Sequence, residues 1–343
     1  MPILETTRHN PTGPHSEHAT PFPTVTVIIP AHDEQQFIKQ CISSVFATGW
    51  PRERLEILVV DHNSTDLTAT IARNAGAKVL VAAPNKRIGG VRNVGLAAAT
   101  GDFVAFVDAD CVVPRTWLTG AITLLRSDPR IGAVGGGPAL APSSGTWVER
   151  SLAPVFSYPG IVRDANTLVT YSFIARTKLL RELGDFNEEL ISGEDDDMSN
   201  RIRRSGRLLV ATTDCRVVHY GFPRTLSAVV RKEMWHGSNH IDVRSGFDVT
   251  LALTLLFIAA SLSAVLGLLA SAASTSTHCV DALLTSLAAQ FLPPALFALK
   301  KLKRSMWHWA FAPQMIAVGY AYFFGHSIGV LGNVYRRLTA NRT

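Results

Sequence analysis

The chain has 343 residues, of which 47% are hydrophobic and 17% are charged, and its formal net charge is +6. The charged fraction lies below the roughly 25% of an average soluble chain, and the apolar excess is concentrated after residue 247, which argues against a wholly soluble protein. The positive charge does not favour nucleic acid binding, because many of the basic residues lie beside the apolar segments, where basic flanks of membrane helices are common.

The four cysteines are far apart in the sequence and form no C-x-x-C pair. Neither a zinc knuckle nor a disulfide framework is indicated, so a reducing compartment is the simpler interpretation. Residues 1–23 lack the hydrophobic region that a secretory signal requires, and we expect a disordered tail there.

Short β-branched runs alternate with helix-like stretches from residue 24 onward. The first run, VTVII at 25–29, ends at Pro30 and predicts a buried strand followed by a loop. The pattern then predicts a helix at 34–48, a strand at 56–60, a helix that begins near 64–66, a strand at 78–81, a helix at 87–99 and a strand at 103–107. Elements that alternate in this way indicate an α/β domain over residues 24–246, with a mostly parallel sheet covered by helices on both faces.

Acidic residues follow three of these strands, at the sheet edge where α/β proteins bind ligands. Glu34 comes soon after the first strand, Asp61 directly after the second, and Asp108 and Asp110 directly after the fourth. A single acid at such a place is equally well explained as a helix cap, but three that converge favour a functional site. The D-x-D pair offers the hard oxygen ligands with which Mg²⁺ or Mn²⁺ bridges a diphosphate.

A second acidic cluster, Glu194-Asp195-Asp196-Asp197, precedes a helix predicted at 198–205. Acids at the start of a helix interact favourably with the helix dipole, which explains Asp196 and Asp197. A transferase also needs one carboxylate that removes a proton from the acceptor hydroxyl, and neighbouring acids keep such a group basic. Glu194 and Asp195 are the candidates for this role.

Three apolar segments follow residue 247. Residues 249–273 carry no charged side chain and are long enough, at about 1.5 Å per helical residue, to cross the roughly 30 Å hydrocarbon layer. Residues 282–299 are interrupted by Gln290 and two prolines, and residues 309–335 contain no Asp, Glu, Lys or Arg. For these two a re-entrant or interfacial path remains open. We expect a membrane region with two or three hydrophobic helices at 247–335 and a basic tail at 336–343.

Five motifs occur along the front of the chain: TVTVIIPAHDE at 24–34, VVDHNSTD at 59–66, RNVGLAAATGDFVAFVDADC at 92–111, GDFNEEL at 184–190 and GEDDDMSNRIRRSG at 193–206. They cover most of residues 24–206 and occur in the order of the family. On these motifs the chain resembles a family 2 glycosyltransferase with the GT-A fold. The resemblance implies a Rossmann-like mixed sheet. The apolar segments that follow resemble the C-terminal transmembrane helices of the processive and lipid-linked branches of the family.

The resemblance also implies roles for individual residues. The nucleotide sugar is bound by Pro30, Ala31, Glu34, Asp61 and Asp108; a divalent cation, Mg²⁺ or Mn²⁺, is bound by Asp110 and Asp108; and Asp195, supported by Glu194, is the catalytic base.

Four further positions differ in how well they fit the family pattern. His62 and Asn63 stand where members often have an acid and a glycine, so contacts with the base are in doubt there. His219 follows a predicted strand at the place of a metal-binding histidine in some members, although a lone histidine is more often structural. Arg231, assigned to the nucleotide sugar, is part of a segment similar to the Q-x-x-R-W signature, but Ala228 replaces the glutamine. This difference argues against a cellulose- or chitin-type polymerase.

These features favour inverting transfer of a sugar from a nucleotide-diphosphate sugar to a polysaccharide or lipid-linked acceptor, with the catalytic domain on the cytoplasmic side of the inner membrane and in contact with membrane lipids. A nucleotidyltransferase is the alternative enzyme, but it usually needs a glycine-rich loop where this chain has PAHDE. A catalytically inactive membrane scaffold is the other alternative, and the retained Asp110 and Asp195 argue against it. The basic cluster at 300–304 predicts that residues 249–273 cross outward and residues 282–299 return, with a shallow path for the third segment.

Overall fold

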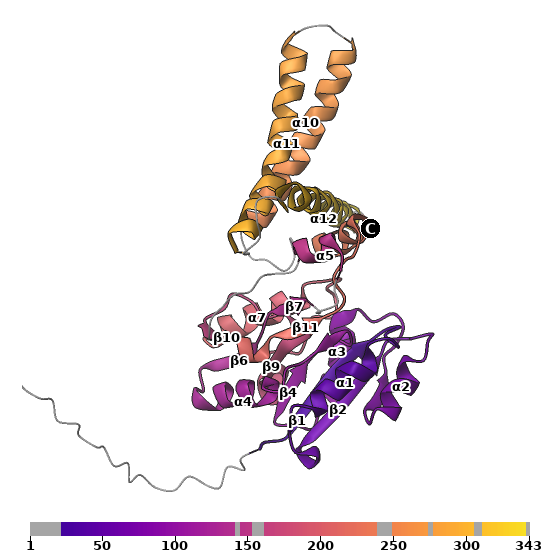
Figure 1. Cartoon of the computed structure of the whole chain (residues 1–343), viewed down its shortest axis with the longest axis vertical. Helices are drawn as coiled ribbons and strands as arrows, with labels where there is room; N and C mark the ends of the chain where they lie inside the picture. Colours follow the sequence, from indigo (N-terminus) through magenta and orange to yellow (C-terminus); the bar gives the residue numbers. More distant parts are fainter. Residues whose placement is uncertain are drawn as a thin grey trace, which may run out of the picture.

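The computed structural model describes residues 22–140, 145–152, 161–238, 249–273, 277–304 and 311–340. The expected N-terminal tail, apart from residues 22 and 23, and the last three residues of the expected basic tail lie outside the described residues. An α/β domain and a long helical hairpin are the two main parts of the described chain (Figure 1).

A mixed sheet of eight strands, in the order β3-β2-β1-β4-β9-β6-β10-β8, forms the centre of the α/β domain. The strands are β1 (Val25–Ala31), β2 (Leu55–Asp61), β3 (Lys78–Val81), β4 (Phe103–Phe106), β6 (Ile131–Gly135), β8 (Ile161–Arg163), β9 (Phe173–Arg176) and β10 (Leu208–Thr212). β3, β2, β1 and β4 are parallel, whereas β9 runs antiparallel to β4 and β6, and β8 runs antiparallel to β10. The predicted mixed α/β sheet is confirmed. The order of the first strands reverses between β1 and β4, and ligands of α/β sheets bind at such a switch point.

A second, three-stranded sheet has the order β5-β11-β7. It consists of β5 (Cys111–Val112), β7 (Pro138–Leu140) and β11 (Val217–His219). In the antiparallel register of β5 and β11, His219 is paired with Cys111. This small sheet therefore brings a distant histidine to the residue that follows the D-x-D pair.

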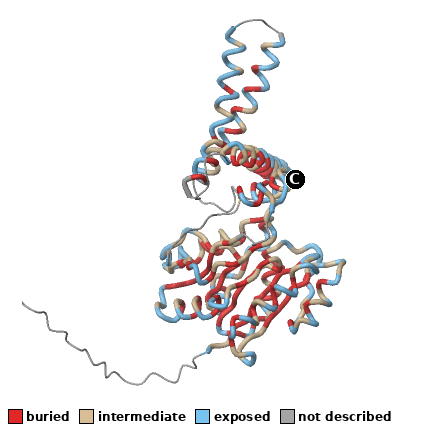
Figure 2. Tube along the Cα trace, in the orientation of Figure 1, coloured by how far each residue is buried: buried red, intermediate tan, exposed pale blue. Residues whose placement is uncertain are grey.

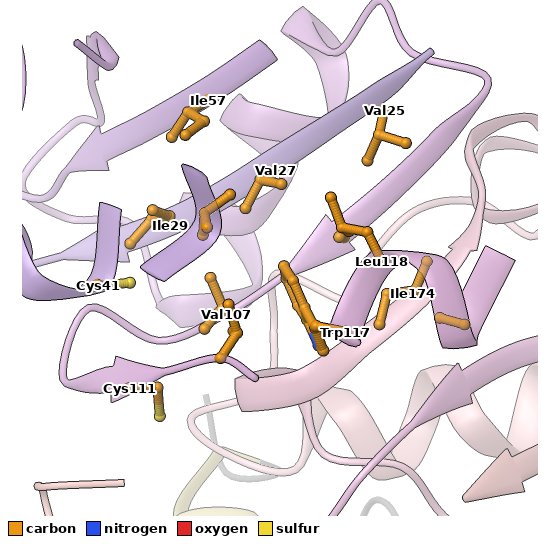
Figure 3. Packing of buried hydrophobic residues seen from close by; sticks show 14 of the residues in the cluster. Val25, Val27, Ile29, Cys41, Ile57, Val107, Cys111, Trp117, Leu118 and Ile174 are labelled. Atoms are coloured by element: carbon orange, nitrogen blue, oxygen red, sulfur yellow. The ribbon is translucent and has the colours of Figure 1, made fainter. Parts of the chain in front are cut away.

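Two apolar clusters cover the two faces of the large sheet, as Figure 2 indicates by the buried strands at the centre of the domain. Val25, Val27 and Ile29 of β1 point into one cluster, whereas Ile28 points into the other, because successive side chains of a strand alternate between faces. The first cluster includes side chains of α1 (Ile38–Phe46) and α4 (Trp117–Ser127), and Figure 3 shows its packing around Trp117. The second includes α3 (Ile88–Ala98), α6 (Thr177–Glu182) and α7 (Glu194–Arg204).

Some helix boundaries differ from the sequence-based expectation. The helix expected from residue 34 begins at Ile38, and the one expected from residues 64–66 is α2, which begins at Thr68 (Thr68–Asn74). Hydrogen bonds between the two loops hold the preceding residues out of helical geometry. The helix expected at 198–205 begins four residues earlier, at Glu194, after Gly193 in the left-handed conformation (φ +79°). Its first turn thus contains all four acids, which the helix dipole favours.

Three helices at the rear are long and apolar enough to cross a membrane. They are α10 (Val249–Ala273), α11 (Thr277–Arg304) and α12 (Ala312–Ala340). α11 continues through Pro293 and Pro294, so these prolines do not end the helix. α10 and α11 form the hairpin, whereas α12 lies across its base (Figure 1). More than half of the apolar window of α12 is buried, against less than a quarter in α10 and α11.

Two short helices join the α/β domain to α12. They are α5 (Trp147–Leu152) and α8 (Leu226–Gly237). A small apolar cluster of Val148 from α5, Val229 from α8, and Val318 and Ala321 from α12 closes this junction. The rear of the chain is therefore packed onto the domain through α12, and not only connected to it by the polypeptide.

Candidate functional site

Two loops at the carboxyl ends of β1 and β2 form the first part of the site. Ala31 and Asp61, the last residues of the two strands, are paired in the parallel register, and Pro30 precedes Ala31 within buried β1. The amide of His62 donates to the carbonyl of Ala31 over 2.8 Å, and the amide of Thr65 donates to Oδ1 of Asp33 over 2.7 Å. The loops are thus fixed to each other before any ligand binds.

Asp61 provides an acceptor with no partner in this part of the site. Its side chain is buried, and Oδ1 has no hydrogen-bond partner among the described residues. A buried polar atom without a partner costs free energy, so it is expected at a place where a ligand supplies the missing hydrogen bond. The position of Asp61 at the carboxyl end of β2, next to β1, fits the nucleotide-binding role that the sequence predicts.

Glu34, Asp108 and Asp110 form an acidic group beside these loops. Burial, followed by the charges of Asp110 and Asp108, raises the pKa of Glu34 to about 7. Carboxylates that raise the pKa of a neighbour repel one another, and a bound cation would relieve this repulsion. The acids from the first and fourth strands therefore converge, as the sequence predicts.

Asp110 and His219 lie together at the other side of the D-x-D pair. Oδ1 of Asp110 is 3.5 Å from Nε2 of His219, and donor atoms of Asp110, Cys111 and His219 all lie within 4.8 Å of one another. A β-carbon on Gly221 would overlap the carboxylate of Asp110, so the glycine leaves the space that this side chain occupies. Burial raises the pKa of the Cys111 thiol well above its usual value, which keeps the sulfur protonated and leaves the carboxylate and the imidazole as the metal donors. This donor set fits Mn²⁺ or Mg²⁺ supplemented by phosphate oxygens.

Arg92 of α3 connects the two acidic parts of the site. Its side chain is 4% exposed; Nη1 lies 2.5 Å from Oε1 of Glu194, and Nη2 lies 3.2 Å from Oδ1 of Asp108. One guanidinium thus neutralises a carboxylate from the D-x-D pair and a carboxylate from the E-D pair. The next residue, Asn93, donates to and accepts from the backbone of Phe186, which fixes α3 to the segment before the E-D pair.

Asp195 and Glu194 differ in their partners. Glu194 is paired with Arg92, whereas Asp195 accepts a hydrogen bond from the amide of Asp196 over 2.9 Å. Although part of Asp195 reaches the surface, enclosure by the surrounding protein, followed by the charges of Glu194 and Asp196, raises its pKa to about 8. A carboxylate with such a pKa accepts a proton far more readily than an ordinary aspartate. The geometry therefore favours Asp195 over Glu194 as a base.

The structure places Arg231 on the exposed side of α8, without a hydrogen bond or ion pair to a described residue. Its assignment to the nucleotide sugar stays a prediction. Burial raises the pKa of Asp110, and the charges of His219 and of the next residue, Lys232, partly offset this increase. Lys232 of α8 is therefore near enough to the D-x-D pair to act on it electrostatically.

Sequence reasoning missed Arg92, Lys232 and Gly221. Arg92 lies within one of the quoted motifs, immediately before Asn93, but its two carboxylate partners are 16 and 102 residues away. Gly221 follows His219 by two residues, and only the fold shows that it faces Asp110. A buried arginine needs acidic partners. A prediction that Arg92 is buried would therefore have directed attention to its carboxylate partners.

Comparisons with known proteins bear on the family and the fold of the chain. The model of the family "Glycosyl transferase family 2" matches residues 26–183. Glycosyltransferase AglE of Haloferax volcanii is 28% identical over 229 residues, which are 65% of this chain and 74% of that protein. The pre-mycofactocin glycosyltransferase of Mycobacterium tuberculosis is 27% identical over 271 residues, 72% of this chain and 54% of that protein. This chain therefore matches only about half the length of the second relative.

Solved structures show the same fold. The mannosyltransferase PcManGT from Pyrobaculum calidifontis, in complex with GDP-Man and Mn²⁺, superimposes with a TM-score of 0.57 at 21% identity and covers 93% of this chain and 89% of its own. TarS of S. aureus in complex with UDP has a TM-score of 0.50 at 20% identity and covers 92% of this chain and 91% of its own. The predicted GT-A fold is thereby confirmed.

Proposed function

We propose that this chain transfers a sugar with inversion from a nucleoside-diphosphate sugar to a glycan or lipid-linked acceptor at a membrane surface. The chain belongs to glycosyl transferase family 2, whose model matches residues 26–183, and it is therefore a glycosyltransferase. The observation that carries the proposal is the arrangement at one sheet edge of an acceptor for the nucleotide (Asp61), a carboxylate–imidazole pair for a cation (Asp110 and His219) and a basic carboxylate (Asp195). The first two serve the donor, and the third serves the acceptor.

The donor side follows from the loops of β1 and β2 and from the D-x-D pair. Asp61 accepts a hydrogen bond from the nucleoside, and the fixed backbone at Pro30 and Ala31 forms the wall against which it lies. Asp110, with His219 and Asp108, would hold the divalent cation, which would compensate the negative charge of the leaving diphosphate. Arg92 adds fixed positive charge close to these acids.

The acceptor side follows from the position of Asp195. Its raised pKa of about 8 allows the carboxylate to take the proton of the acceptor hydroxyl as the oxygen attacks the anomeric carbon. Arg92 pairs with the adjacent Glu194, so that of the two acids Asp195 is left for proton transfer. A single displacement opposite the leaving diphosphate inverts the configuration at the anomeric carbon.

The membrane side of the site supports a lipid-linked acceptor. Ser192, two residues before Glu194, donates to the carbonyl of Trp235 on α8 over 2.9 Å, and α8 packs along α12. The E-D pair is thus joined through one short helix to an apolar segment that can enter a bilayer. We propose that the catalytic domain faces the cytoplasm, where nucleotide sugars are present.

Transfer by the full-length protein in detergent or membranes tests this proposal. A panel of radiolabelled nucleotide sugars identifies the donor, and the anomeric configuration of the product shows whether the transfer inverts. Asp195→Asn should lower turnover by at least roughly a hundredfold with little change in donor affinity. Asp197→Asn is the matched control, because Asp197 is on the same helical turn but is paired with Arg201 at 2.7 Å. Equal turnover of both variants would contradict the assigned base.

A further inference from the structure

The helices α8 and α12 approach each other backbone to backbone. A β-carbon on Gly325 would lie within 3.0 Å of the carbonyl oxygen of Val230, and one on Gly329 within 3.0 Å of the carbonyl oxygen of Met234. On the other helix, a β-carbon on Gly237 would lie within 3.0 Å of the carbonyl oxygen of His326. Backbone atoms cannot move aside as a flexible side chain can, so these three glycines fix one distance and one register between the helices.

Polar contacts strengthen the same packing. Oε2 of Glu233 lies 3.6 Å from Nδ1 of His326, and both side chains are almost fully buried. At the end of α8, the carbonyl of Ser238 accepts from Nδ2 of Asn333 over 2.6 Å and from Nη2 of Arg336 over 3.0 Å. Polar groups buried between two helices specify how these pair, because a shifted register would leave them without partners.

The end of α8 is also tied to the catalytic domain. The hydroxyl of Ser192 donates to the carbonyl of Trp235 over 2.9 Å and lies 3.3 Å from the carbonyl of His236. Both carbonyls belong to the last turn of α8, and that of Trp235 also accepts from the amide and the hydroxyl of Ser238. Ser192 is 1% exposed and is followed by Gly193 in the left-handed conformation, and α7 then begins at Glu194. The hydroxyl therefore holds the backbone directly before the E-D pair.

We propose that α12 is a positioning element of the active site: by fixing α8, it fixes the two carbonyls that hold Ser192, and Ser192 sets the position of Asp195. This inference rests on the proposed role of Asp195. The remainder of α7 is held independently, since Met198 and Ile202 are buried in the core of the domain. Loss of the contact between α8 and α12 therefore displaces the first turn of α7 without unfolding the helix.

The position of the donor-binding residues separates this effect from a general loss of structure. Asp61 and Ala31 lie at the ends of strands in the centre of the sheet, and α12 packs on α8 and α5 at the periphery (Figure 1). A weakened contact between α8 and α12 is expected to reduce turnover while nucleotide affinity is retained. A protein that had lost its fold would lose both.

Gly329→Leu and Gly332→Leu form a matched pair of variants for the test. Both replace a glycine of α12 with the same good helix former, but a β-carbon at Gly329 would overlap α8, whereas nothing lies within 4 Å of one at Gly332. In the full-length protein, Gly329→Leu should lower turnover at least roughly tenfold and leave the affinity for the nucleoside diphosphate within about twofold, whereas Gly332→Leu should leave both unchanged.

Ser192→Ala provides the second measurement. It removes one hydrogen bond and should lower turnover by roughly three- to tenfold in the wild-type background. In the Gly329→Leu background it should cause no further loss, because the carbonyls that it reaches are already displaced. Wild-type turnover of Gly329→Leu, additive losses in the double variant, or a parallel loss of nucleotide affinity would each overturn the proposal.

The same assays keep the two proposals apart. Full turnover in Asp195→Asn would refute the assigned base, and with it the proposed consequence of the link through Ser192. An inactive Asp195→Asn protein together with a fully active Gly329→Leu protein would refute the positioning role of α12 alone.

Discussion

Replacement of Arg92 with methionine removes the one guanidinium that joins the D-x-D and E-D pairs. Arg92 lies 2.5 Å from Glu194 and 3.2 Å from Asp108, and both Arg92 and Glu194 are almost fully buried, with side chains 4% and 5% exposed. Methionine has a similar length and is apolar, so the volume is retained and the charge is lost. Glu194 is then left ionised in a buried position without its partner.

The expected cost is large because only one partner of a buried ion pair is removed. Such changes destabilise proteins by about 3–5 kcal/mol, mainly because the remaining charge is uncompensated. For a domain of this size, the apparent Tm should fall by about 6–20 °C. The double variant Arg92→Met/Glu194→Gln removes the buried charge as well, so most of the lost stability should return.

Turnover should not return with stability. In the double variant Asp108 still lacks the arginine that orients it, and the concentration of Mn²⁺ needed for half-maximal activity should remain raised. Thermal unfolding of the detergent-solubilised protein and transfer rates over a range of Mn²⁺ concentrations measure the two effects separately. Arg181→Met is a suitable control, because Arg181 also fixes α3 but does so by donating to backbone carbonyls, those of Leu96 and Ala99.

Two results would refute this reasoning. If Arg92→Met unfolded at the same temperature as Arg181→Met, the buried pair would have no special energetic role. If the double variant recovered wild-type Mn²⁺ dependence and turnover along with its stability, Arg92 would serve only to neutralise Glu194, and the connection to Asp108 would be without consequence.

Three further outcomes are expected. Asp195→Asn should raise the Tm above about pH 6 while it abolishes turnover. Because the pKa of Asp195 is raised, the folded state binds more protons than the unfolded state between about pH 4 and 8, so wild-type stability falls as pH rises through this range, and a neutral asparagine removes this fall. A Tm difference between the two proteins that does not grow with pH would contradict the assignment. The same pKa predicts that kcat/KM increases with pH up to about 8, and a flat profile between pH 6 and 8 would exclude Asp195 as the group that titrates. Asp110→Ala should leave the protein folded and inserted but inactive at every Mn²⁺ concentration, and full wild-type activity in excess chelator would refute the metal requirement.

The fold could be predicted to a large extent from local patterns. The strands at 25–29, 56–60, 78–81 and 103–107 all occur, because short runs rich in β-branched residues, separated by helix-like stretches, identify the strands of an α/β sheet. Helix starts were less accurate. Glu34 is a good helix former, yet Asp33 adopts a positive φ of 54° and binds the neighbouring loop, so α1 begins only at Ile38. Such contacts join residues about 30 positions apart, and no local pattern contains them.

The site was predictable where it depends on strand ends and unpredictable where it depends on tertiary contacts. Four acids lie at or just after the ends of parallel strands, and the carboxyl ends of parallel strands meet at one edge of the sheet. The convergence of these acids therefore follows from the sequence pattern; they are Glu34, Asp61, Asp108 and Asp110. The proximity of His219 to Asp110 depends on the pairing of β5 with β11, which only the fold establishes. Arg92 is hidden for a related reason, since its partners lie on two other segments.

The path of α12 follows from the same tertiary contacts. The sequence leaves a transmembrane and a shallow path open, because 309–335 are apolar and long enough for both. In the structure α12 lies across the base of the α10–α11 hairpin, and along much of its length it packs on α8, whose Lys232 acts on the D-x-D site (Figure 1). We propose that a helix held in this way follows a shallow path, with its buried His326 near Glu233 and not in lipid. We therefore expect a cysteine at Thr277, the first residue of α11, to react with an impermeant reagent outside intact cells, and one at Thr339 to remain unlabelled. Strong labelling at Thr339, with the native cysteines replaced, would show that α12 crosses the membrane and that its packing on α8 is not the arrangement in the bilayer.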